Sequence, residues 1–167
     1  MHRLQGKTEL VTDLDALREL YRDKLADVVR HEAGARNVRQ YDANNTYQYI
    51  INREETQLSW IAKAVQELGG TVDDITEPAS QAASTDPAAI EADDATRAQA
   101  FVDRWRAKAA QMNDARHGLM INVILGEMLE QKRFFEQARE GREDLLGTRS
   151  SAAGERVGSV RSTRWIE

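Results

Sequence analysis

The chain has 167 residues, a formal net charge of −5 and no cysteine. This length suits one compact domain. The negative charge argues against nucleic acid as the main partner, and the missing cysteines exclude disulfides, thiolate metal sites and cysteine nucleophiles. No apolar segment of about 18 residues is present, so no part of the chain is expected to span a membrane. Because the N-terminus also lacks the apolar stretch of a signal peptide, we expect a soluble cytoplasmic protein.

The composition favours helix, since Ala, Glu, Arg and Leu are common and runs of alternating β-branched residues are not evident. A first helix is expected over about residues 13–43, where apolar residues recur at three- and four-residue spacing. A second is expected over about 46–68, and Gly69 and Gly70 supply its stop. So short a connection predicts an antiparallel helical hairpin that turns near residue 44.

The helical pattern stops over residues 71–89, which hold both prolines and many small polar residues. This stretch is long enough to run back along the hairpin as a crossover connection. Two further helices are expected over about 89–112 and 115–140. The predicted fold is therefore all-α: an antiparallel four-helix bundle within residues 1–141, with a long crossover between the second and third helices. Residues 142–167, rich in Gly, Ser and Arg, are expected to form an extended or flexible tail.

Three of the expected helices place a glutamate on their apolar face. Glu54 lies four residues before Leu58 on the stripe of the second helix. Glu32 holds such a position on the first helix, and Glu127 does so on the fourth, with Glu130 one turn further on. Given the predicted turn, Glu32 and Glu54 are expected at nearly the same height in the bundle.

Carboxylates that pack together in a low dielectric repel one another, so they must be protonated, paired or bound to metal. A hard divalent or trivalent metal neutralises several of them at once, because it takes several oxygen ligands. The alternative is that Arg36, Arg53 or Arg133 turns inward and pairs with them. The spacing of the residues leaves both alternatives open.

Two segments resemble the first helical hairpin of ferritin-like proteins, especially rubrerythrin-like ones. They are RHEAGARNVRQY, from Arg30 to Tyr41, and INREETQLSWIAKAVQELGG, which ends at Gly70. The resemblance covers residues 14–70 well and 92–140 loosely. It implies a four-helix bundle with a long crossover and a di-iron site, to which two helices each give one Glu and the other two each give an ExxH motif.

On this resemblance the residues at motif positions are the expected metal ligands: Glu32, Glu54, Glu127 and Glu130. Gln57 and Tyr41 are expected as further ligands or as hydrogen-bond partners of the ligands. Gln57 and Glu130 stand where the family has histidine, so the expected site is poor in His and holds iron or another divalent metal. His31 and His117 are off the motif positions and are expected to be exposed or structural. The resemblance implies iron binding, oxidation or storage and leaves open whether the protein is an enzyme.

The competing hypothesis is a non-catalytic bundle, a scaffold or interaction protein that kept the fold and lost the metal. We expect a homo-oligomer, and Trp60, Trp105 and Trp165 are candidate anchors for a partner. The stretch from Val157 to Arg161, VGSVR, resembles the short peptide by which ferritin-like cargo proteins dock inside encapsulin shells. The alternative for this stretch is a disordered C-terminus.

Overall fold

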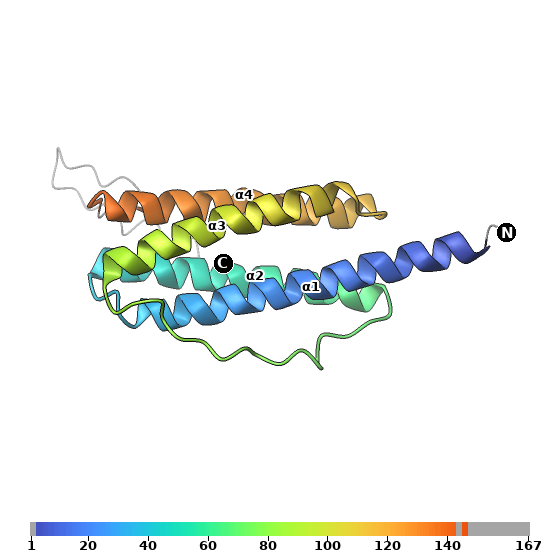
Figure 1. Cartoon of the computed structure of the whole chain (residues 1–167), viewed down its shortest axis with the longest axis horizontal. Coiled ribbons are helices and arrows are strands. Elements are labelled where there is room, and N and C mark those ends of the chain that lie inside the picture. Colours follow the sequence, from blue (N-terminus) through green and yellow to red (C-terminus); the bar gives the residue numbers. More distant parts are fainter. Residues whose placement is uncertain (1–2, 143–144, 147–167) are drawn as a thin grey trace, which may run out of the picture.

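The computed structural model describes residues 3–142 and 145–146, with side chains from residue 13 onward. Within these residues it is all-α, and four helices pack together (Figure 1). The helices are α1 (Arg3–Ala35), α2 (Tyr41–Glu67), α3 (Pro87–Ala110) and α4 (Ala115–Arg139). The prediction of an all-α chain with four helices is therefore confirmed. No helix in this part of the chain is both long and apolar enough to cross a membrane.

The helices pack as two pairs, α1 with α2 and α3 with α4, and the pairs meet through α2 against α4 and α1 against α3. The segment between α2 and α3 runs back along the bundle beside α1 (Figure 1). Arg18 of α1 fastens it by donating hydrogen bonds to the Thr71 carbonyl and, at 2.7 Å, to Asp74. The long connection thus lets α3 begin at the end of the bundle where α2 also begins.

The turn between α1 and α2 comes earlier than predicted. α1 ends at Ala35 and α2 begins at Tyr41, whereas the sequence pattern favoured a break near residue 44. Two polar side chains explain the difference. The Gln40 side chain accepts a hydrogen bond from the backbone N–H of Ala43 and caps α2. The Asn44 side chain then donates to the carbonyl of Ala35 at 3.0 Å, which closes the turn from inside the helix.

The apolar core is divided into two clusters by a band of buried polar residues. The first cluster contains Trp105, Ile61 and Ile124, and each of these residues is completely buried. The second contains Ile50 and Phe135 and lies at the end of the bundle where α2 starts. This band consists of the buried polar residues that lie along their helices between members of the two clusters: Lys24, Asp27, His31, Glu54, Gln57, Asp94 and Gln131.

Candidate functional site

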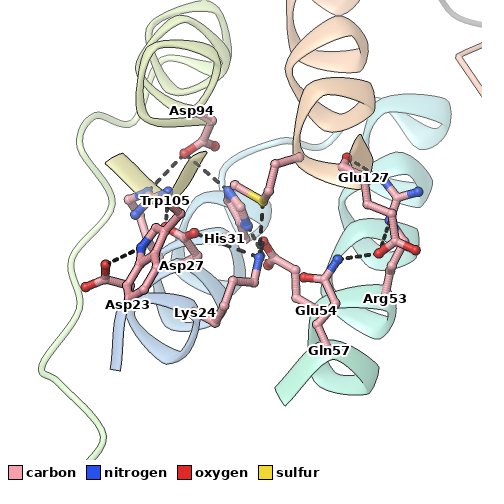
Figure 2. Close-up of polar contacts among 12 residues, drawn as sticks. Asp23, Lys24, Asp27, His31, Arg53, Glu54, Gln57, Asp94, Trp105 and Glu127 are labelled. Atoms are coloured by element: carbon pink, nitrogen blue, oxygen red, sulfur yellow. Dashed lines mark hydrogen bonds and ion pairs between the residues drawn. The ribbon is translucent and has the colours of Figure 1, made fainter. Parts of the chain in front are cut away.

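A buried ion pair between α1 and α2 lies at the centre of the bundle. The Lys24 ammonium is 3.0 Å from Oε1 of Glu54, and both side chains are completely buried. His31 Nδ1 lies 2.8 Å from the other carboxylate oxygen, Oε2. Figure 2 shows Glu54 pointing between Lys24 and His31, so both of its oxygens have a partner from α1.

The Lys24 side chain is enclosed by apolar groups on its other sides. Its ammonium lies 3.1 Å from the Met128 sulfur and 5.2 Å from the centroid of the Phe101 ring. Asp27, one turn along α1, is 3.9 Å away. A thioether and a ring face are weak partners, so the carboxylates are what stabilise this buried cation.

Asp94 of α3 is the second buried carboxylate of the site. It accepts hydrogen bonds from the Tyr47 hydroxyl at 2.6 Å and from Arg30 Nε at 3.2 Å. His31 Nε2 lies 3.6 Å from it, within ion-pair range but without a hydrogen bond. His31 therefore stands between two carboxylates, Glu54 on one side and Asp94 on the other (Figure 2). We call the following set the central polar cluster: Lys24, Asp27, Arg30, His31, Tyr47, Glu54 and Asp94.

Neighbouring charges in this cluster stabilise the ionised forms of Glu54 and His31. Burial by itself would raise the pKa of Glu54, but the attraction of His31 and Lys24 outweighs it and lowers the pKa to about 2. Burial would lower the pKa of His31, but Glu54 and then Asp94 outweigh that effect and raise it. Burial and the neighbouring Asp94 carboxylate together raise the pKa of Tyr47, so its hydroxyl stays a donor. The arrangement is a set of matched ion pairs.

The raised pKa of His31 predicts that the bundle becomes less stable as the pH rises. The protonated imidazole stabilises the folded state fully below its unfolded pKa of about 6.5, and this contribution is lost as the pH passes through the higher folded value. Thermal unfolding between about pH 6 and pH 9 measures the effect. His31→Gln should flatten this dependence. A wild-type midpoint that rises over the same range would contradict the expectation.

At the level of Glu54, the inward residue of α1 is His31 and not the predicted Glu32. His31 is buried with 1 % exposure, whereas Glu32 is partly exposed. The buried stripe runs through Lys24, Val28 and His31 at helical spacing, so charged residues occupy core positions of α1. His31, which was expected to be exposed or structural, is thus buried and pairs with Glu54.

Two of the other predicted ligands, Glu127 and Glu130, lie between α2 and α4, where both pair with Arg53. Arg53 donates to Glu130 at 3.1 Å and to the backbone carbonyl of Glu127 at the same distance. Gln57 donates to the Glu127 side chain. Figure 2 shows Arg53, Gln57 and Glu127 as a group apart from the pair of Lys24 and Glu54. Between α2 and α4, Arg53 therefore turns inward and pairs with the glutamates, which is the alternative to a metal ion stated above.

Tyr41 lies at the first residue of α2 and is 72 % exposed. It is too far toward the end of the bundle to support a central site, because Glu54 is more than three helical turns further along the same helix. The four glutamates named above are not brought together: one is paired in the core, two pair with Arg53 and one is partly exposed.

A di-metal centre does not fit the residues in the middle of this bundle. In the part of the chain that the structure describes, no group of three or more His, Asp or Glu side chains is arranged to hold a metal ion. The best-placed carboxylate, Glu54, already has an ammonium at 3.0 Å and an imidazole at 2.8 Å. A metal ion on the same oxygens would have to displace Lys24 and leave that cation buried without its partner, which is costly.

Lys24 and Asp94 were not among the site residues predicted from the sequence. Asp94 lies four residues after Ile90 and four before Ala98, and both of these are buried, so the helical period alone was a signal for an inward acid. Lys24 carried the same signal, four residues after Leu20, but a lysine at a core position needs a partner that only the tertiary structure identifies.

His117 and the tryptophans lie away from the cluster or have packing roles. His117, buried at the start of α4, lies 3.7 Å from Glu67. Trp105 is completely buried and donates to Asp23 at 2.8 Å, while Trp60 on α2 is 37 % exposed. Trp165 lies outside the described residues. Of the described tryptophans, only Trp60 remains available as an anchor for a partner.

No protein-family model, curated protein or solved structure matches this chain. In the site itself, each of the central carboxylates Asp27, Glu54 and Asp94 has a cationic partner within the chain.

Proposed function

We propose that this protein is a ferritin-like four-helix bundle whose di-metal centre has been replaced by internal ion pairs, and that it acts as a non-catalytic scaffold or interaction protein. The observation that carries the proposal is the buried pair of Lys24 and Glu54. Glu54 stands at the motif position of the second helix, where the resemblance implies a metal ligand, and a lysine takes the charge-neutralising role of the metal.

The ferritin-like part of the proposal has two supports. One is the resemblance of residues 30–41 and 51–70 to the first hairpin of that family. The other is the order of the helices, in which two hairpins are joined by a long connection between α2 and α3. In this arrangement the central polar cluster occupies the position at which such bundles hold their cofactors. A cytoplasmic location is part of the same proposal.

The loss of metal chemistry follows from charge balance. A di-metal carboxylate site needs anionic ligands that only the metal neutralises. Here Arg30 pairs with Asp27 at 2.8 Å and with Asp94 at 3.2 Å, while Lys24 pairs with Glu54. The carboxylates are thus neutralised before any metal arrives, and an added divalent ion would bring excess positive charge into a low dielectric.

Metal reconstitution tests the proposal. Full-length protein is treated with a chelator, incubated with iron, manganese or zinc, desalted and assayed for bound metal and for thermal stability. We expect substoichiometric metal and an unchanged unfolding midpoint, because no added ion finds a free carboxylate set in the core. One or two metals per chain that are lost in Glu54→Gln would refute the proposal and restore the di-metal hypothesis.

We also propose that the C-terminal residues 157–161 dock the protein onto a partner such as an encapsulin shell. These residues lie outside the described part of the chain, so the support is their resemblance to a docking peptide. Fusing residues 150–167 to an unrelated carrier and co-expressing it with a shell protein measures packaging. We expect the fusion to be packaged, whereas a fusion in which Val157 and Val160 are changed to Asp should remain outside. A wild-type fusion that also remains outside would end this proposal.

A further inference from the structure

Gln131 of α4 is a buried amide whose polar atoms have no partner in the part of the chain that the structure describes. Its side chain is completely buried, and neither Nε2 nor Oε1 makes a hydrogen bond to another described residue. A buried donor and a buried acceptor that stay unpaired are costly, and an apolar residue would fill the same position without this cost. The amide therefore needs a hydrogen-bonding partner other than the protein groups around it.

Glu130, the residue before Gln131, fixes the height of the amide against α2. Glu130 accepts a hydrogen bond from Arg53 of α2 at 3.1 Å. Glu54, the residue after Arg53, turns into the core and is completely buried, as Gln131 is. Because Glu54 and Gln131 are each one residue from this contact, they lie at nearly the same height in the bundle.

Lys132, the residue after Gln131, fixes the same height against α3. Lys132 donates a hydrogen bond to Gln99 of α3 at 2.9 Å. Ala98, the residue before Gln99, is buried and therefore faces the core at nearly the height of Gln131. Its side chain is only a methyl group, so this is the side of the layer on which a molecule the size of water fits.

Helix α1 adds two polar groups to this layer. The Lys24 ammonium, 3.0 Å from Glu54, lies 3.1 Å from the sulfur of Met128. Met128 is three residues before Gln131, so the two share one face of α4. Asp27 Oδ2 is 3.9 Å from the same ammonium and has no hydrogen-bond partner among the described residues. The layer thus holds a buried carboxylate oxygen and a buried amide that both lack a partner.

We propose that a water molecule is bound inside the bundle between the Gln131 amide, Asp27 Oδ2 and the Lys24 ammonium. Water both donates and accepts, so one molecule can donate to the carboxylate and still accept from the ammonium or the amide. Helix α4 meets the central polar cluster through the Met128 sulfur and the Phe135 ring, and the water would add a polar link from α4 to α1.

The charges of the central polar cluster favour a neutral occupant over an ion. Each of its carboxylates already has a cationic partner, at 3.0 Å for Glu54, 2.8 Å for Asp27 and 3.2 Å for Asp94. An added ion of either sign would therefore stay unbalanced in a low dielectric. The water site rests on this geometry and holds whether or not the protein acts as a scaffold.

A crystal structure of the full-length protein, at a resolution that shows ordered water, tests the site. We expect a water oxygen about 2.7 to 3.2 Å from both the Gln131 amide and Asp27 Oδ2. A direct hydrogen bond between Gln131 and Asp27, or an amide with no density beside it, would overturn the proposal and leave the metal-free core intact. A peak about 2.0 to 2.5 Å from the carboxylate oxygens would be a metal ion and would overturn both.

Gln131→Met measures what the bound water contributes to stability. The change removes the amide, so the urea midpoint should fall by about 0.5 to 1 M as Asp27 loses the bridged partner. Gln66→Met, the same change at an exposed position of α2, should leave the midpoint unchanged. A Gln131→Met protein at least as stable as wild type would show that the amide holds nothing in the core and would overturn the proposal. If this variant does not fold, the wild-type crystal structure decides.

Discussion

Replacing Lys24 with methionine is expected to lower the free energy of unfolding by roughly 3 to 5 kcal/mol. Methionine has a similar length but no charge, so Glu54 keeps His31 at 2.8 Å and loses the ammonium at 3.0 Å. The carboxylate then has an unpaired oxygen in a fully buried position. Chemical denaturation followed by circular dichroism measures the change.

Lys63→Met is the matched control, since Lys63 lies on α2 and is exposed. Its expected effect is within about 0.5 kcal/mol, as for most surface substitutions. A Lys24→Met protein as stable as this control would mean that the ammonium is not what neutralises Glu54, and the core would need another cation.

Replacing Asp94 with alanine is the second large effect, and we expect it to cost about 3 to 5 kcal/mol. The change removes the acceptor of the Tyr47 hydroxyl and one of the two carboxylate partners of Arg30. It also removes the carboxylate that faces His31 Nε2 at 3.6 Å. Three polar groups on α1 and α2 then lose their partner on α3, and the contact between the hairpins weakens.

Two comparisons isolate the role of the carboxylate in this prediction. Asp93→Ala, one residue away on a partly exposed position, should cost less than about 1 kcal/mol, because its ion pair with Arg97 is near the surface. Tyr47→Phe should fall between the two, since it removes one donor and leaves Asp94 its other partners. Equal effects of the changes at Asp93 and Asp94 would show that the acid has no special part in holding the hairpins together.

The fold was predictable from the sequence because it depends on features that are local. The features that define the four helices and the long connection are the helical spacing of apolar residues, the two glycines after α2, Pro78 in the connection and Pro87 at the start of α3. The sequence pattern places the turn after α1 several residues too late, because Asp42, Asn44 and Asn45 are residue types typical of a break between helices. Asn44 instead lies within α2 and donates its side chain to the carbonyls of Ala35 and Val38.

The site was less predictable, because the residues that pair with one another in it come from different helices. Glu54 was correctly expected in the core, and it is completely buried. Which group neutralises it depends on the rotation of α1 about its axis, which turns His31 inward in place of its neighbour Glu32 and buries Lys24 beside Glu54. Apolar spacing fixes that rotation only loosely when the stripe itself contains charged residues. Motif positions therefore located the acid, whereas tertiary packing decided whether a metal or a lysine faces it.

A double-mutant cycle on Lys24 and Glu54, measured by denaturation in chelator-treated buffer, tests the metal-free core most directly. The single changes Lys24→Met and Glu54→Leu each leave one buried charge without its main partner, whereas the double change removes both charges. We predict a coupling free energy of roughly 2 to 3 kcal/mol and a wild-type stability that the chelator does not alter. Coupling below about 0.5 kcal/mol, together with a wild-type protein that loses stability on chelation, would contradict the pairing and point to a metal on Glu54.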